Sequence, residues 1–301
     1  MLVGTRRMMA GFSALAAVTL VAAGCGSTKS TSTPNSPVPT GSKDPAIFAM
    51  LPQSIQQSGV VEVGSDAAYP PVEYQDNGQI IGLDPDIAAA MGQKMGVTWH
   101  FTNATFAGLI PAVQSGRYNV AMSAMSDNKE REQKLNFLDY FNVGTSIIVA
   151  AGNPQNIQGL DDLCGKTIAV QRGTTQDEVS KEQQAKCASS GKGTLTVLTF
   201  TTDPEALLQV QTERAVADMN DYPVAEYTVQ QTKGKYEVVG TQIQAGPYGI
   251  GFDKDETQLL NASQAALKAI ISDGTYTAIL AKWGLQQGSL TTAEINGGGK
   301  S

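Results

Sequence analysis

The stretch at 120–131 combines small and charged residues in an order that suits binding of a small carboxylate. A short apolar strand at 119–122 is expected to lead into small residues and then into a helix that opens with Asp127 and Asn128. The small residues are Ser123, Ala124 and Ser126. Small side chains leave backbone N–H and C=O groups accessible, and a helix start offers free N–H donors. Because Arg131 adds a planar cation that matches a carboxylate, the stretch predicts a carboxylate receptor; a solvated helix face is the alternative.

An amino acid also carries an ammonium group, which needs a carboxylate on the protein. Asp221 is our candidate, because it follows a predicted strand at 215–219 and begins a predicted helix, where loops present side chains to a crevice. The sequence at 173–175 offers a second helix N-terminus for the ligand carboxylate. Both features have a structural alternative, with Asp221 as an N-cap and Thr174 forming a capping box with Asp177. Capping and binding are compatible, so both interpretations stay open.

The composition restricts the classes of function. With 301 residues, of which 41% are hydrophobic, the chain can bury one large core or two modest ones. The net charge is −7 and the sequence has no basic run interleaved with aromatic residues, so we expect no nucleic-acid partner. The chain has one histidine, His100, and three cysteines, which argues against a His/Cys metal site. We therefore predict neither a metal nor a cofactor.

The N-terminal residues have the pattern of an exported lipoprotein. Arg6-Arg7 precede an apolar run at 8–23 that is short for a membrane span. The run ends in small residues before Cys25, which resembles a bacterial lipobox; a chance cysteine after an ordinary signal peptide is the alternative. We predict that 1–24 is a signal peptide and that lipid on Cys25 anchors the protein on the extracytoplasmic side of the cell membrane. Residues 25–42, rich in Ser, Thr and Pro, would then be a flexible tether.

Strands and helices are expected to alternate along two successive units. In the first unit, a strand at 60–64 precedes a hairpin that turns at Asn77-Gly78 and a helix at 84–95. The second unit begins near Asn153 and repeats the alternation. This order predicts an α/β fold with a largely parallel sheet. The polar, Gly-rich tail at 288–301 is predicted to be loose.

Cys164 and Cys187 both lie in the second unit. An even pair of cysteines in an exported protein predicts a disulfide, since Cys25 would be used by the lipid. Closing a loop of this length would stabilise the fold by about 3 kcal/mol in the chain-entropy model. Two buried free thiols are the alternative.

The separate motifs together resemble those of the family 3 extracellular solute-binding proteins, which serve ABC importers of polar amino acids. The resemblance covers about 60–283 and rests on several distant stretches in the family's order. These are Gly82-Leu83-Asp84-Pro85-Asp86, Phe106-Ala107-Gly108-Leu109-Ile110-Pro111-Ala112, Arg131 after its small-residue strand, Gly173-Thr174-Thr175, and Asn220-Asp221.

The resemblance implies an α/β fold of the two-lobe, type II periplasmic-binding-protein kind, with two hinge crossings and the ligand in the cleft between the lobes. Lobe 1 would comprise 43–145 and 244–287, and lobe 2 would comprise 146–243 with both crossings. A ligand held by one lobe favours closure, because the other lobe adds contacts only in the closed form.

The resemblance also implies roles at the two charged ends of an amino acid. Arg131 would hold the α-carboxylate, helped by the backbone N–H groups of Ser126 and Thr175. Asp221 would pair with the α-ammonium, joined by an oxygen of Ser123 or Ser126. Because Arg131 would lie on lobe 1 and Asp221 on lobe 2, one ligand would bridge the two lobes.

Other matched residues would surround the side chain of the ligand. Tyr69 and Phe106 would sandwich it, with Asp66 and Gln171 at its polar end. An acid beside aromatic rings favours a cationic side chain, such as that of lysine, arginine, ornithine or histidine. Gln171 as a donor would also suit glutamine. Ala124 stands where the family often has glycine.

We therefore predict the substrate-binding component of an ABC importer for a polar or cationic amino acid. It would be a monomer that docks on a membrane permease and catalyses no reaction. A sensor that presents its ligand to a membrane kinase is one alternative, with identical binding chemistry. A dehydratase of prephenate or arogenate is another, but it would need a nucleophile–base pair or a second carboxylate arranged for proton transfer, and we recognise neither in the sequence.

Overall fold

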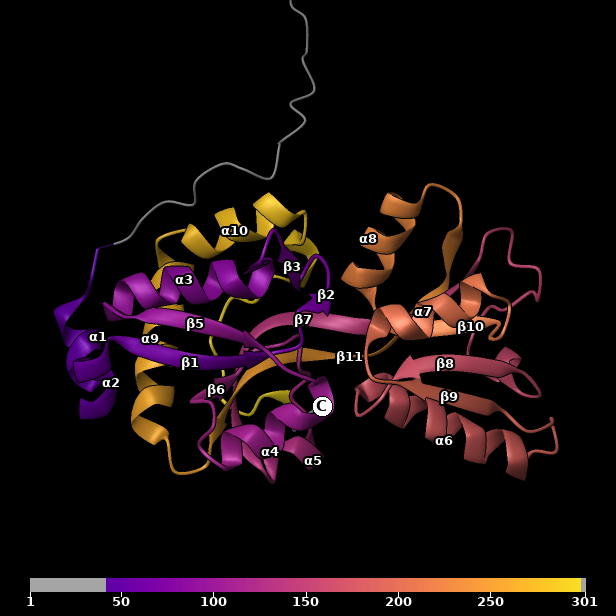
Figure 1. The fold of residues 1–301 in the computed structure, drawn as a ribbon, viewed down its shortest axis with the longest axis horizontal. Coiled ribbons are helices and arrows are strands. Elements are labelled where there is room, and N and C mark those ends of the chain that lie inside the picture. Colours follow the sequence, from indigo (N-terminus) through magenta and orange to yellow (C-terminus); the bar gives the residue numbers. More distant parts are fainter. Residues whose placement is uncertain (1–41, 299–301) are drawn as a thin grey trace, which may run out of the picture. The chain divides into compact units, whose positions relative to one another are not determined.

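The computed structural model describes residues 42–298 of the chain (Figure 1). The predicted signal peptide and the predicted lipidation site, Cys25, lie outside the described residues. Among residues 42–298, no helix has both the length and the apolar character that crossing a bilayer requires.

The first part of the chain alternates short strands and helices and ends in one long strand. Its elements are α1 (Pro45–Met50), α2 (Gln53–Ser58), β1 (Val60–Ser65), β2 (Ala68–Tyr69), β3 (Glu73–Asp76), β4 (Gln79–Ile81), α3 (Leu83–Met95), β5 (Thr98–Asn103), η1 (Phe106–Gly108), α4 (Leu109–Gln114), β6 (Val120–Ala121), α5 (Lys129–Glu132) and β7 (Leu135–Ala150).

The second part repeats the alternation and returns along another long strand. Its elements are η2 (Leu160–Leu163), β8 (Thr167–Gln171), α6 (Thr175–Ser189), β9 (Thr196–Phe200), α7 (Asp203–Gln211), β10 (Ala217–Asp221), α8 (Tyr222–Thr232), β11 (Tyr236–Asp253), α9 (Thr257–Ser272), α10 (Thr275–Trp283) and η3 (Gln286–Gly288).

One sheet runs through both lobes in the order β5-β1-β6-β11-β7-β10-β8-β9. The strands β5, β1 and β6 of lobe 1 are parallel to one another, and so are β10, β8 and β9 of lobe 2. The two long strands β7 and β11 pair antiparallel and belong to both lobes (Figure 1). Their register shifts between Val239 and Ile243 and again before Gly246. Each of the two long strands makes one crossing between the lobes.

Each lobe has its own buried core on both faces of its strands. In Figure 1, α3 and α10 lie on one side of the lobe 1 strands and α4 on the other; in lobe 2, α7 and α6 lie on opposite sides of β8. Fully buried Leu83, Tyr140 and Tyr248 belong to the main core of lobe 1, whereas Ile168 and Met219 belong to a core of lobe 2. Val224 of α8 in lobe 2 joins the lobe 1 core, so the two lobes are in contact there.

Local sequence chemistry explains the turns that open and close these elements. Asn77 and Gly78 have φ angles of 48° and 80°, as the predicted tight hairpin between β3 and β4 requires. Gly82 precedes α3 with φ of 140°, and a Cβ there would overlap the carbonyl oxygen of Val72. Gly96 ends α3 in the left-handed conformation, directly after residue 95, where the predicted helix ends.

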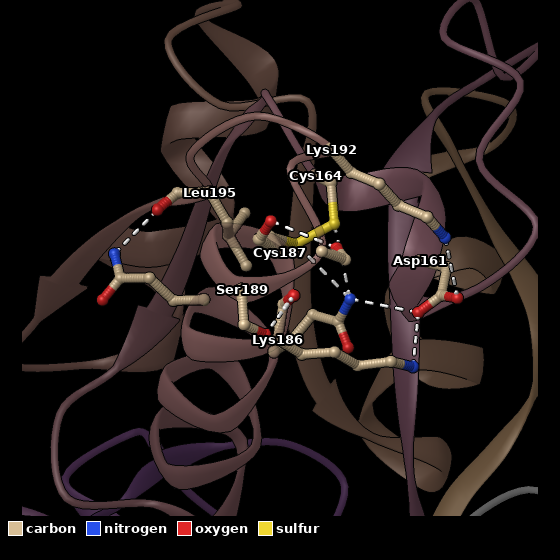
Figure 2. Close-up of a disulfide and its surroundings, with 10 residues drawn as sticks. Asp161, Cys164, Lys186, Cys187, Ser189, Lys192 and Leu195 are labelled. Atoms are coloured by element: carbon tan, nitrogen blue, oxygen red, sulfur yellow. Dashed lines mark hydrogen bonds and ion pairs between the residues drawn. A yellow bond between two sulfur atoms is a disulfide. The ribbon is translucent and has the colours of Figure 1, made fainter.

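The structure contains the predicted disulfide between Cys164 and Cys187 (Figure 2). The two Cα atoms are 5.3 Å apart, and the bond joins the residue after η2 to the last turn of α6. Asp161 sits beside the bond and accepts hydrogen bonds from Lys186 and Lys192 (Figure 2). The disulfide thus ties α6, whose first turn faces the candidate site described below, to the loop that enters lobe 2.

The C-terminal segment differs from its prediction. We expected a loose tail from 288, but up to residue 298 the segment is hydrogen-bonded to β7. Ile295 forms an isolated antiparallel bridge with Leu138, and the N–H of Asn296 donates to the carbonyl of Phe137 at 2.9 Å. We predicted a loose tail because the segment is polar and rich in glycine. The structure orders it through hydrogen bonds to the backbone of β7, which the amino-acid composition of the segment does not reveal.

Candidate functional site

A pocket lined by both lobes lies between residues of lobe 1 and residues of lobe 2. Its walls contain eight of the residues predicted from the sequence, namely Asp66, Tyr69, Phe106, Ser123, Ala124, Gln171, Thr175 and Asp221. The remaining lining residues are Ala68, Glu73, Thr174, Gln176 and Asp203. Two predicted residues, Ser126 and Arg131, lie outside this wall.

Topology explains why these residues meet. Asp66 follows the end of β1, Gln171 ends β8, and Asp221 ends β10. Ser123 follows β6, and Asp203 follows β9 after a short loop. All five therefore come from the carboxyl ends of parallel strands, which is where open α/β sheets bind their ligands.

Asp221 is buried and directs its carboxylate into a set of hydrogen-bond donors. Gln176 Nε2 donates to Oδ1 at 2.7 Å, and the hydroxyls of Tyr248 and Tyr69 donate to Oδ2 at 2.8 and 3.1 Å. Burial raises the pKa of Asp221 to about 6, although these donors and Arg131 oppose the shift. Asp221 is the N-cap residue of α8, but its side chain makes no capping hydrogen bond. The carboxylate is therefore directed to the pocket and not to the helix end.

Arg131 is buried beside the pocket, with 4% of its surface exposed. Its Nη1 donates to the carbonyl of Ser126 at 2.8 Å and its Nη2 to the carbonyl of Gly173 at 3.1 Å. The guanidinium carbon lies 5.5 Å from the ring centre of Phe106. Burial lowers the pKa of Arg131, which nearby acids partly oppose. Within residues 42–298 the guanidinium is in no direct ion pair, although Glu178 and Asp221 lie near enough to favour its charge.

Two backbone segments beside Arg131 offer N–H groups. Ser126 and Tyr248 form an isolated antiparallel bridge. The two hydrogen bonds of this bridge are donated by the N–H groups of the neighbouring residues Asp127 and Gly249, so the N–H of Ser126 takes no part in them. Its hydroxyl lies 3.1 Å from that of Thr175, the first residue of α6. The N–H groups in the first turn of α6 have no acceptor within the helix. Ser126 and Thr175 thus bring donors from the two lobes together.

Thr174 does form the predicted cap of α6. Its Oγ1 accepts from the N–H of Asp177 at 3.2 Å, and the carboxylate of Asp177 accepts from the N–H of Gly173 at 3.0 Å. This arrangement fixes the direction of the helix end. The structural alternative is therefore present and, as expected, does not block the pocket, which Thr174 and Thr175 both line.

Asp66 and Gln171 are in direct contact across the lobes. Gln171 Nε2 donates to Asp66 Oδ2 at 2.7 Å and to the carbonyl of Thr201 at 3.0 Å. The N–H of Phe106 also donates to Asp66 Oδ2, at 3.2 Å. Burial raises the pKa of Asp66 in spite of these donors. Both N–H donors of Gln171 are thus in use, so this residue has no free donor for a ligand.

Sequence reasoning missed two acids in the pocket, Glu73 and Asp203. Glu73 accepts a hydrogen bond from Ser123 Oγ at 2.9 Å, and burial raises its pKa well above the usual value, as does the nearby Asp84. Burial raises the pKa of Asp203 to about 7, and its Oδ1 has no hydrogen-bond partner among the described residues. Asp203 could have been found by the rule that selected Asp221, because both follow predicted strands.

Comparison with known proteins places this geometry in a family. The arginine-binding protein ArgT of Corynebacterium glutamicum is 34% identical over 255 residues, which cover 84% of this chain and 83% of ArgT. An ancestral arginine-binding protein solved with bound arginine superimposes with a TM-score of 0.70 at 34% identity, covering 75% of this chain and 98% of that one.

A second ancestral structure is similar to the same degree. It is an amino acid-binding protein described as a precursor of cyclohexadienyl dehydratase, with a TM-score of 0.69 at 34% identity, covering 76% of this chain and 97% of that one. These structures share the two-lobe α/β fold that the sequence predicted. The model of the bacterial extracellular solute-binding proteins, family 3, matches residues 61–286, and the chain belongs to this family.

Proposed function

We propose that the protein is the extracytoplasmic substrate-binding component of an ABC importer and that it binds a cationic amino acid. The observation that carries the proposal is that a cation, Arg131, and an acid, Asp221, lie beside the same pocket without an ion pair between them. Each is buried, each lacks an ion-pair partner within 42–298, and each comes from a different lobe beside one pocket. A zwitterion supplies the two missing counter-ions at once.

The ligand α-carboxylate would bind between Arg131 and the two nearby N–H groups. The guanidinium donates to the carbonyls of Ser126 and Gly173, and an Arg side chain has five N–H donors, so others are left for a carboxylate. The N–H groups of Ser126 and Thr175 would complete the site. This arrangement neutralises the buried cation, which is why a carboxylate is favoured over a neutral group.

The ligand α-ammonium would bind at Asp221. Three donors already hold this carboxylate in place, so it needs little rearrangement to accept from an ammonium. The hydroxyl of Ser123 lines the same pocket. A bound cation also favours the charged form of Asp221, which burial otherwise disfavours.

The charge of the remaining pocket supports a cationic side chain. Asp66 and Asp203 line the pocket in addition to Asp221, Glu73 adds a fourth acid whose raised pKa favours its neutral form, and no Lys or Arg is among the lining residues. Gln171, which could have served a glutamine side chain, already donates to Asp66 and to Thr201. The naming of the C. glutamicum relative as an arginine-binding protein is consistent with this choice.

The test is calorimetric titration of the ligand-free protein with the twenty standard amino acids. With ornithine added to this set, we expect arginine, lysine, ornithine or histidine to bind most tightly, glutamine more weakly, and glutamate and aspartate weakest. Preferential binding of glutamate would contradict the cationic assignment. Absence of binding by every amino acid would contradict the receptor function itself.

The importer role includes a membrane anchor and a permease partner. The sequence around Cys25 supports lipidation, and we propose that the mature protein is a lipid-anchored monomer. Intact mass and fractionation would test this: wild-type protein should carry the lipid mass and sediment with membranes, and Cys25→Ser should be released. We propose no turnover, and incubation with prephenate or arogenate followed by product analysis checks that statement.

A further inference from the structure

The segment after the last helix packs against lobe 1 along a definite path. We call residues 289–298 the C-terminal strap; they lie beyond the residues that the family model matches, 61–286. The N–H of Leu290 donates to the hydroxyl of Tyr276 at 3.0 Å. Ala293 is buried in the lobe 1 core, and its carbonyl accepts from Gln264 Nε2 at 2.8 Å. These contacts fix the beginning of the strap.

The strap next pairs with residues 137–139 of β7, on the side of the strand that faces away from β11. The N–H of Asp139 donates to the carbonyl of Glu294, and Asn296 closes two hydrogen bonds with the backbone of Phe137, at 2.8 and 2.9 Å. In this half of β7 the other side is paired with β11. The strap therefore takes the place of an edge strand.

The strap ends on two buried carboxylates. The N–H of Gly297 donates to Asp139 Oδ2 at 3.1 Å, and the N–H of Gly298 donates to Asp127 Oδ2 at 2.9 Å. Only 3% of Asp139 and 4% of Asp127 is exposed. Because both acids are buried side by side, the strap gives them donors that would otherwise have to come from elsewhere.

Asp127 connects the strap to the ligand site. It directly follows Ser126, whose carbonyl accepts from Arg131 Nη1. Its own N–H donates to the carbonyl of Pro247 on β11 at 2.9 Å, while its carboxylate accepts from Gly298. A Cβ at Gly298 would overlap the carbonyl oxygen of Asp127, so the backbones lie in close contact. Asp127 is thus held by β11 on one side and by the strap on the other.

We propose that the C-terminal strap is a positioning element of the binding site, which holds residues 123–131 in the conformation that receives the ligand carboxylate. Strap and ligand then act on the same segment, one through Asp127 and the other through Ser126 and Arg131. Ligand affinity depends on the strap although no strap residue lines the pocket. The effect on affinity presupposes the proposed amino-acid binding, whereas the effect on residues 123–131 does not.

The test compares Gly298→Ala with the matched control Gly159→Ala. Gly159 has extended backbone and open space around the position of a Cβ, so alanine should be accepted there. Calorimetry with L-arginine should show affinity about fivefold to tenfold weaker for Gly298→Ala and unchanged for Gly159→Ala. Amide hydrogen exchange of the ligand-free variant should be faster at 123–131.

Two outcomes would overturn the proposal. One is arginine affinity within about twofold of the control together with unchanged exchange at 123–131. The other is faster exchange confined to 135–141, which would reduce the strap to an edge cover for β7. If wild-type protein binds no amino acid, the proposed function fails and the exchange at 123–131 alone decides the role of the strap.

Discussion

The two ends of the pocket are built on different principles. At one end stand a cation on lobe 1, Arg131, and an acid on lobe 2, Asp221, which in the proposed binding mode would each meet one charge of the constant part of an amino acid. At the other end, Asp66 and Asp203 bring acids from both lobes together, and no cation lines the pocket among the described residues. The first end should recognise any amino acid, whereas the second should select the side chain.

The largest effect is expected at the constant end. Arg131→Ala and Asp221→Ala should each weaken binding of every amino acid by about 2–5 kcal/mol, because each leaves a ligand charge buried without its partner. Calorimetry measures this loss. Exposed Arg172→Ala and Asp162→Ala are matched controls and should bind as the wild type does. If either substitution weakened arginine binding and glutamine binding by very different amounts, the two ends of the pocket would not act independently.

The next effect should appear only at the selective end. Asp203→Asn should weaken arginine binding by about 1–3 kcal/mol, since a buried acid that faces the ligand cation becomes neutral. Glutamine binding should be unchanged or slightly stronger, because it carries no side-chain charge. The ratio of the two affinities, measured by calorimetry, is the readout. Equal losses for both ligands would place Asp203 at the constant end.

The pH dependence should separate the two ends as well. The pKa of Asp221 is about 6 and that of Asp203 about 7, both raised by burial. Below its pKa each acid is neutral and cannot pair with a cation, so affinity falls as pH falls, by up to about tenfold per pH unit for each acid. Arginine affinity should begin to fall near pH 7, whereas glutamine affinity should begin to fall near pH 6. Titrations across this range check the order.

The smallest effect concerns a residue that supports the constant end. Tyr248→Phe removes the hydroxyl that donates to Asp221 Oδ2 at 2.8 Å. Because Asp221 makes this hydrogen bond without a ligand as well, its loss should weaken the binding of all amino acids equally and by only about 1 kcal/mol, the typical net value of one hydrogen bond. It should also raise the pKa of Asp221 further, which would move the acid limb of the glutamine profile to higher pH. An unchanged profile would mean that Tyr69 and Gln176 suffice to hold the carboxylate.

Position along the sequence explains which parts of the site could be predicted. Asp66 and Asp221 each follow a predicted strand, so the rule for carboxyl ends of parallel strands brings them into one pocket. The same rule applies to Asp203, which follows β9 and also lines the pocket, although we did not predict it as a site residue. Arg131 was expected to hold the carboxylate, and that role stays a prediction; the structure adds that the side chain lies beside the pocket wall and is held by two carbonyls.

The sequence by itself determined the features that depend on neighbouring residues: the Asn77-Gly78 turn, the end of α3 at Gly96, the cap at Thr174 and the alternation that gives an α/β fold. Only the tertiary structure decided the contacts between distant residues. Tyr69 reaches Asp221 across 152 residues, and Gly298 reaches Asp127 across 171. Turns and caps are fixed by local backbone chemistry, whereas these contacts depend on how the lobes and the last segment pack, and no local pattern encodes that packing.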